Sequence, residues 1–265
     1  MDEKRFRLSV FTKAWRTMPL PELARFVRHL GFDGVELPVR PGFQVPPERA
    51  LTDLPLAVKQ FAEEGLTIYS IAAPVEEATI AACAAAGVPI LRTMAQILEG
   101  ETYLQAEERL RRTYDATLPL LEKYGVTLGI QNHCDRFVAN AVGLMRLIGG
   151  YDPRYIAAVW DAGHEAVNGG LPEYALDVVW SHLCMVNFKN AFWLRTNGPE
   201  APQAEWRHYW TLGRHGLSPW PRIVADLKRR GYDKVLCLTA EYTDEARVNA
   251  LIIEDVAYVK ALLAE

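Results

Sequence analysis

Short apolar runs alternate with longer segments of helical period along the whole chain. Eight runs are predicted as strands, at residues 8–11, 34–37, 67–72, 90–93, 127–131, 156–160, 184–189 and 235–240. Helices are predicted at residues 21–30, 51–64, 75–86, 101–124, 139–148, 171–180, 219–230 and 244–263. Because strands that alternate with helices are parallel and joined by right-handed crossovers, the pattern predicts an α/β fold, a single (β/α)8 TIM barrel over residues 1–265.

Glycine supports this division of the chain, since it follows most predicted helices just before the next strand, as at Gly87, Gly125 and Gly149. Glycine accepts the left-handed conformation that ends many helices. An open, doubly wound sheet is the structural alternative. That fold more often has a phosphate-binding glycine loop after its first strand, and the sequence contains no GxGxxG or Walker pattern.

Composition narrows the class of protein further. The chain has 265 residues, 50% of them hydrophobic, and a net charge of -4, which gives no general attraction to nucleic acid or to an anionic membrane. It has no apolar stretch near the roughly 18 residues of a membrane span, and its N-terminal segment lacks the apolar core of a secretory signal. We therefore expect a cytoplasmic protein with no nucleic-acid or membrane partner. The four cysteines are widely spaced and expected to be free: Cys83, Cys134, Cys184 and Cys237.

The longest connection, at residues 190–218, follows the seventh predicted strand and is rich in aromatic residues. Its content argues against disorder. We interpret it as a lid over the mouth of the barrel that brings Trp193 and Arg195 to a substrate. A contact between subunits is the alternative interpretation.

Polar groups end three of the predicted strands, at the edge of a barrel where chemistry is usually placed. They are Gln131, His133, Asp161, His164 and Glu241. If these strands face one pocket, the five side chains meet there. The structural alternatives are that Asp161 caps the following turn, that Gln131 fills a polar layer of the core, and that Glu241 is an exposed loop acid.

Two further strands carry polar candidates. Asn187 and Lys189 share one face of the seventh strand, and a lysine that points into a barrel is explained best by an anion or a carbonyl group. A lysine extended along the surface is the alternative. Glu36 ends the second strand in the same way as Glu241, and Trp15 lies near the expected mouth, where an aromatic ring suits the apolar face of a sugar.

These stretches together resemble the sugar phosphate isomerase/epimerase family, the xylose isomerase-like barrels. The resemblance covers nearly the whole chain and is carried by GFDGVEL, GVTLGIQNH, WDAGH, VNFKNA and GYDKVLCLTAEY. It implies a small sugar or polyol substrate and often a homodimer or homotetramer.

The resemblance also implies one divalent metal ion, Mn2+ or Mg2+, held by four strand-end residues. By position the ligands would be Gln131, Asp161, Asn187 and Glu241, where family members typically have Glu, Asp, His and Glu. Amide oxygens can ligate a hard cation, and His133 or His164 could compensate, but the lower charge predicts weaker metal binding.

The same two departures bear on the reaction. Gln131 cannot carry a proton, so isomerisation or dehydration fits better than epimerisation by two bases. We predict Glu241 as the base, a metal or Lys189 as the group that stabilises the enediolate, and His164 or His133 as the relay for the second proton.

Two other functions remain open. A barrel that has lost catalysis and only binds a sugar, or serves as an assembly subunit, would explain the two lost ligands. A metal-dependent endonuclease of the related repair fold would need a multi-metal cluster, and the six histidines are too scattered in the sequence to supply one.

Overall fold

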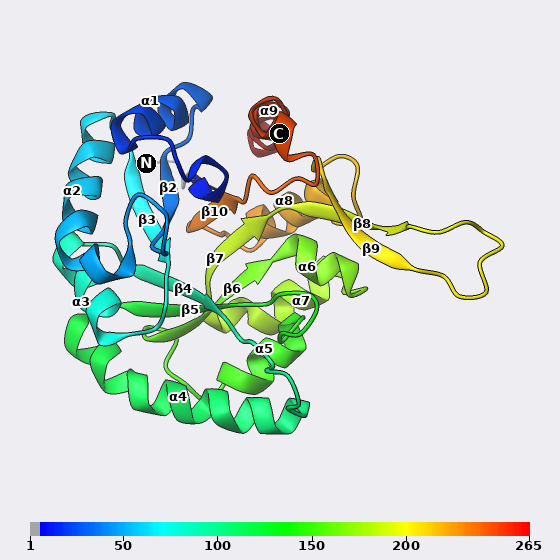
Figure 1. Ribbon diagram of the computed structural model, residues 1–265, viewed down its shortest axis with the longest axis horizontal. Helices are drawn as coiled ribbons and strands as arrows, with labels where there is room; N and C mark the ends of the chain where they lie inside the picture. Colours follow the sequence, from blue (N-terminus) through cyan, green and yellow to red (C-terminus); the bar gives the residue numbers. More distant parts are fainter. Residues whose placement is uncertain (1–5) are drawn as a thin grey trace.

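A closed parallel barrel forms the body of the protein, as the computed structural model shows for residues 6–265 (Figure 1). The first five residues of the predicted domain and of its N-terminal segment lie outside the described range. Within that range the barrel strands are β1 (Arg7–Phe11), β2 (Gly34–Pro38), β3 (Thr67–Ala72), β4 (Ile90–Met94), β5 (Thr127–Gln131), β6 (Ile156–Asp161), β7 (Leu183–Phe188) and β10 (Val235–Leu238). They close in the order β1-β10-β7-β6-β5-β4-β3-β2, which confirms the predicted TIM barrel.

Helices cover the outside of the barrel (Figure 1). They are α1 (Leu20–Leu30), α2 (Ala50–Glu63), α3 (Glu77–Ala86), α4 (Tyr103–Tyr124), α5 (Ala141–Ile148), α6 (Ala162–Val167), α7 (Pro172–Val179), α8 (Trp220–Arg229) and α9 (Val248–Ala264). Short 3-10 turns lie at η1 (Thr12–Trp15), η2 (Pro47–Arg49), η3 (Trp180–His182) and η4 (Glu245–Arg247). The short helix α6, which directly follows β6, is an addition to the predicted set.

Alternation along β6 shows how the sequence builds two cores. Val159 packs with Phe11 and Met185 in a small cluster inside the barrel. Its neighbour Trp160 belongs to the large cluster between strands and helices, together with residues such as Leu144. Because side chains alternate along a strand, Asp161 returns to the inner side at the carboxyl end of β6.

The glycine joints behave as predicted at two helix ends and differently at a third. Gly87 and Gly125 end α3 and α4 in the left-handed conformation, with φ of 69° and 65°. Gly149 ends α5 with φ of −63°, so there the chain turns without the left-handed residue that the sequence predicts.

The long connection after β7 is a hairpin. Its strands β8 (Asn190–Arg195) and β9 (Trp206–Thr211) pair antiparallel and project from the barrel (Figure 1). Aromatic residues favour strands, which is why a segment predicted as a lid loop becomes a β-ribbon. The tip points away from the barrel, and the base lies beside its mouth.

No helix among residues 6–265 is long and apolar enough to cross a membrane. The predicted cytoplasmic location stays a prediction, as do the homodimer and homotetramer. The four cysteines are free, as expected.

Candidate functional site

A layer of polar side chains lies inside the barrel below its mouth. We call it the inner layer: Glu36, Ser70, Arg92, Gln131 and Asp161. Arg92 Nε donates to Glu36 Oε1 at 2.7 Å, and Ser70 Oγ donates to the same oxygen at 3.1 Å. Arg92 also donates to Gln131 Oε1, and Gln131 Nε2 donates to Asp161 Oδ2 at 2.8 Å. These hydrogen bonds link side chains from five neighbouring strands, β2 to β6, and Glu36 Oε2 is buried without a hydrogen-bond partner among residues 6–265.

Asp161 completes the layer and starts α6. Its Oδ1 accepts hydrogen bonds from the backbone N–H groups of Gly163 and His164, at 3.0 and 2.9 Å. Burial raises the pKa of Asp161 to about 6, although Lys189 favours the charged form. The sequence alternatives of a capping aspartate and of a glutamine in a polar layer both describe this geometry.

A second group of polar side chains, which we call the rim, lies above the inner layer: Lys13, His133, Lys189 and Glu241. Lys189 Nζ lies 2.8 Å from Glu241 Oε2, and Lys13 Nζ lies 2.7 Å from Glu241 Oε1. Burial disfavours the Glu241 carboxylate, but the two ammonium groups outweigh this and hold its pKa well below its usual range.

Lys189 stays charged in this setting. Burial alone would lower its pKa, whereas the carboxylates of Glu241 and Asp161 raise the pKa above its ordinary value. The same ammonium lies 4.1 Å from the centre of the Trp210 ring, a cation–π distance. Asp161 and Glu241 thus act on one buried cation, although Asp161 belongs to the inner layer and Glu241 to the rim.

The rim opens onto a cavity of about 680 Å3. Lys13, His133, Lys189 and Glu241 also line a narrower extension of about 70 Å3, which reaches down to Arg92, Gln131 and Asn187. Phe43 and Trp210 line the wider part and supply aromatic surface. A cavity of this size with charged groups at its base is typical of a small-molecule site.

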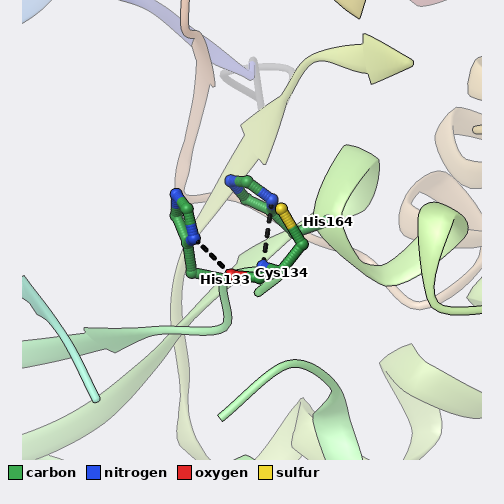
Figure 2. A group of neighbouring side chains, drawn as sticks. All are labelled: His133, Cys134 and His164. Carbon is green, nitrogen blue, oxygen red and sulfur yellow. Dashed lines mark hydrogen bonds between the residues drawn. The ribbon is translucent and has the colours of Figure 1, made fainter. Parts of the chain in front are cut away.

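Two histidines meet at the edge of this cavity, and only one of them lines it. The ring centres of His133 and His164 are 3.8 Å apart. Figure 2 shows that His133 Nδ1 contacts the carbonyl oxygen of Cys134, at 2.8 Å, and that the Cys134 N–H donates to His164 Nδ1, at 3.2 Å. His164 is fully buried, and burial lowers its pKa well below the ordinary value, so it is neutral and removed from a ligand in the cavity.

Three histidines that are far apart in the sequence lie close together in the structure. His133, His164 and His208 come together around Trp210, whose ring centre lies 5.1 Å from that of His164 and 5.6 Å from that of His208. The hairpin carries His208 back to the end of β5, so these three histidines lie close in space although they are far apart in the sequence. The expectation that the histidines do not supply a multi-metal cluster stays a prediction.

The predicted substrate-binding residues lie elsewhere. Glu36 is fully buried in the inner layer and paired with Arg92. Trp15 is 5% exposed and donates to Asn249, and Arg195 contacts Asn197 inside the hairpin. Trp193 donates to the carbonyl oxygen of Val167 and packs on His208. Of the part of the chain that the structure describes, the cavity lining includes none of these four, and their contact with substrate stays a prediction.

Four residues that line the cavity are not predicted as site residues from the sequence: Lys13, Arg92, His208 and Trp210. Arg92 has a signal, since it interrupts the apolar strand ILRTM at an inward position. Lys13 follows a strand but sits among ordinary surface residues. His208 and Trp210 reach the site only through the hairpin, whose register the sequence leaves open.

The four predicted metal ligands do not fit a divalent cation as they are placed. Gln131 donates to Asp161 and accepts from Arg92, so its oxygen is taken. Both oxygens of Glu241 are bound by ammonium groups. Asn187 Oδ1 is buried without a hydrogen-bond partner among residues 6–265, but one amide oxygen is a weak ligand beside charged Lys189. The predicted Mn2+ or Mg2+ therefore has no role in the mechanism below.

A closed parallel barrel with a polar cavity at the carboxyl ends of its strands defines the class of protein as a TIM-barrel protein with a small-molecule site. Within this class, a family model described as a xylose isomerase-like TIM barrel matches residues 24–262. The chain belongs to that family, which confirms the resemblance seen in the sequence.

Individual relatives have related names. Inosose dehydratase of Bacillus velezensis is 27% identical over 134 residues, which is 49% of this chain and 45% of that protein. D-psicose 3-epimerase of Clostridium cellulolyticum has a similar structure, with a TM-score of 0.74 and 13% identity over 97% of this chain and 99% of that one. The 3-keto-D-glucoside 4-epimerase of E. coli has a TM-score of 0.73 and 11% identity, over 97% and 100%. At such identities the two structures show the fold alone.

Proposed function

We propose that this protein is an enzyme, a sugar or polyol isomerase that removes a proton from the carbon next to a carbonyl group. One observation carries the proposal: a protonated lysine, a neutral histidine and a carboxylate meet at the base of a cavity of about 680 Å3. The epimerase and dehydratase names of the relatives support a small polyhydroxy carbonyl compound as substrate.

We assign the base to His133 rather than to Glu241. A carbonyl oxygen only accepts hydrogen bonds, so His133 Nδ1 carries the proton that it shares with Cys134, and Nε2 keeps its lone pair. Burial lowers the pKa of His133, so the ring is neutral near pH 7. Glu241 is a weak base, because Lys189 and Lys13 hold its pKa low.

Lys189 then acts as the electrophile. When His133 Nε2 takes the proton, the C–H electrons form the carbon–carbon double bond of an enediolate and the carbonyl electrons move to oxygen. The ammonium of Lys189 stabilises this oxygen, and Glu241 keeps the ammonium in place and charged. Isomerisation ends when the imidazolium returns the proton to the former carbonyl carbon. The proton of the neighbouring hydroxyl group passes to the enediolate oxygen, and the new carbonyl group forms at the carbon that lost its hydrogen.

Dehydration is the second candidate, favoured by the sequence similarity to inosose dehydratase. It shares the first step. The enediolate would then expel a hydroxyl group from the adjacent carbon as water, with the proton supplied by the His133 imidazolium. Epimerisation by two bases is less suited to this site, because Gln131 carries no proton and is held in the inner layer.

An endonuclease function is the least supported. It needs several metal ions on carboxylates and imidazoles. The carboxylates of Asp161 and Glu241 are occupied by hydrogen bonds and ion pairs, and the cavity base is lined by the cations Lys13, Lys189 and Arg92.

The test is exchange of substrate protons with solvent deuterium, followed by NMR over a panel of ketoses, aldoses and inososes without added metal. We expect exchange next to the carbonyl in the wild type and a loss of about 100-fold or more in His133→Gln. The acid limb of the pH–rate profile should lie below 6.5 and vanish in that variant.

One control variant and two alternative outcomes test the assignment of His133 as the base. His215→Gln changes an exposed histidine that follows β9 and should leave exchange unchanged. Full exchange in His133→Gln, with loss in Glu241→Gln, would return the role of base to Glu241. Saturable binding of a panel member without exchange in any protein would instead establish the degenerate sugar-binding barrel.

A further inference from the structure

Three side chains with metal-binding atoms converge at the edge of the cavity: Cys134, Asp135 and His208. Cys134 Sγ lies 3.4 Å from Asp135 Oδ2 and 3.9 Å from His208 Nδ1, and Asp135 Oδ1 lies 3.8 Å from the same nitrogen. None of the three belongs to the four ligands that the family resemblance implies.

The spacing matches a tetrahedral centre. Zinc binds sulfur, nitrogen and oxygen at about 2.0–2.3 Å, so the ligand atoms of a tetrahedral site lie about 3.3–3.7 Å apart. The contacts of 3.4 and 3.8 Å are made by the two different oxygens of Asp135, and Cys134 Sγ lies 3.9 Å from His208 Nδ1. With one ligand atom from each residue, the three atoms lie within 4.8 Å of one another, so a rotation of the Asp135 carboxylate and a small inward shift give tetrahedral spacing. A thiolate, an imidazole and a carboxylate suit Zn2+ better than Mg2+ or Mn2+.

The arrangement differs from a catalytic cysteine triad. In a proton relay the two nitrogens of the imidazole divide the work, one facing the nucleophile and the other the acid. Here the thiol and the carboxylate both approach Nδ1 of His208. His208 Nε2 is buried and has no hydrogen-bond partner within residues 6–265. Convergence on one nitrogen is the pattern of ligands around a shared cation.

Backbone geometry brings the two neighbouring ligands to the same point. Side chains of consecutive residues normally diverge, but Asp135 has a φ of 67°, a left-handed conformation that few non-glycine residues adopt. His208 is held on the other side by Trp193, whose ring centre lies 4.0 Å away. His164, although close, already accepts the Cys134 N–H at its Nδ1 (Figure 2).

We propose that Cys134, Asp135 and His208 bind a Zn2+ ion that fastens the β8–β9 hairpin to the loop after β5. The fourth position faces the cavity that Asp135 and His208 line, and water or a ligand oxygen completes the coordination there. The site ties the hairpin base, and with it Trp210, to the rim. It stands or falls independently of the isomerase proposal.

Cobalt reports this site directly, because thiolate-bound Co2+ has a charge-transfer absorption band in the near ultraviolet. The reduced, chelator-treated protein should bind one equivalent of Co2+ with this band, and Zn2+ should displace it. Cys134→Ser should abolish the band. His208→Ala and Asp135→Asn should each weaken binding by more than the ~10–100-fold that loss of a second-shell partner costs.

A second readout follows the hairpin itself. Arg195 and Arg207 flank its tip and are sites for trypsin, and Zn2+ should slow cleavage after them in the wild type but not in His208→Ala. The matched controls are Cys83→Ala, a buried thiol of α3, and His215→Ala, an exposed histidine after β9; both should behave as wild type.

The outcomes divide cleanly. Failure of the wild type to develop the band, a band that persists in Cys134→Ser, or equal affinity in His208→Ala would each overturn the proposal. If Cys134→Ser does not fold, the hairpin variant His208→Ala and the exposed-loop variant Asp135→Asn decide the matter, with circular dichroism as the check on folding.

Discussion

Two polar regions lie at the carboxyl-terminal end of this barrel, and they differ in what their charged groups contact. In the inner layer, hydrogen bonds link Glu36, Arg92, Gln131 and Asp161 to one another, and burial shields them from solvent. At the rim, Lys189 and its partners face a cavity of about 680 Å3. Polar groups that hydrogen-bond to one another stabilise the barrel, whereas polar groups that line a cavity can bind a ligand and act on it.

This difference explains why residue type alone misassigns roles. Asp161 and Glu241 are both strand-end carboxylates. Burial raises the pKa of Asp161 to about 6, while two ammonium groups lower that of Glu241. Four variants, taken from the largest expected effect to the smallest, separate the two regions.

Arg92→Met should cause the largest loss, because it leaves the fully buried Glu36 without its cation. Breaking a buried ion pair from one side typically costs about 3–5 kcal/mol. The side chains of Arg92 and Glu36 are 5% and 0% exposed, so water cannot replace the lost partner. Urea unfolding followed by circular dichroism measures the change in the free energy of unfolding.

The double variant Arg92→Met with Glu36→Leu is the control. Replacing both members of a buried pair by apolar residues is often neutral, so most of the lost stability should return. A cost below about 1 kcal/mol for Arg92→Met alone would show that the inner layer is wetter than its geometry indicates.

The fold could be predicted from the sequence because local patterns encode it. Short apolar runs such as Ile156–Asp161 and left-handed glycines such as Gly87 define each unit before any long-range contact is known. The hairpin is the exception, because its aromatic strands pair with each other outside the βα repeat.

The roles of the site residues are harder to predict from the sequence, because each role depends on the hydrogen-bond and ion-pair partners of the side chain. Gln131, Asp161, Lys189 and Glu241 lie close together, but which oxygen is free depends on Arg92, Lys13 and the start of α6. These partners come from distant strands and loops. Only the three-dimensional arrangement shows that Gln131 and Glu241, two of the predicted metal ligands, have their oxygens engaged by other groups.

Lys189→Met should have the next largest effect, this time on rate and not on stability. Removing one preorganised group that stabilises an oxyanion typically lowers kcat about 100- to 1000-fold. Stability should fall by less than in Arg92→Met, since Glu241 keeps its contact with Lys13. Solvent-deuterium exchange into the substrate provides the measurement.

Lys13→Met is the matched control, because Lys13 contacts the same carboxylate but its side chain is 46% exposed. We expect a decrease of a few-fold at most. Equal losses in both variants would mean that the pair acts only by holding Glu241, and would remove Lys189 as the electrophile.

Glu165→Gln tests a buried acid beside the inner layer and should have an intermediate effect. Glu165 accepts the backbone N–H of Ala141 at 2.9 Å and Trp160 Nε1 at 3.2 Å. Burial raises its pKa from 4.5 to about 7. A carboxyl with a higher pKa when folded binds more protons in the folded state, so its contribution to stability is lost as pH rises through this range.

The free energy of unfolding of the wild type should therefore fall by about 2–3 kcal/mol more than that of Glu165→Gln between pH 4.5 and 8. Denaturant unfolding at several pH values measures the difference. Asp161 and Asp255, whose pKa values are also raised by burial, keep their own slope in both proteins. Parallel stability curves would show that Glu165 is already solvated.

Trp210→Leu should have the smallest effect, and it links the hairpin to the rim. The Trp210 ring lies 4.1 Å from Lys189 Nζ, and a cation–π contact of this kind is worth about 1 kcal/mol. We expect kcat to fall by about fivefold with the acid limb of the pH profile unchanged, because His133 keeps its hydrogen bond to Cys134. Trp206→Leu, at an exposed position of the same strand, is the control and should retain full activity. A shift of the acid limb in Trp210→Leu would mean that the ring acts on His133 instead, and the boundary between hairpin and rim would then have to include the base.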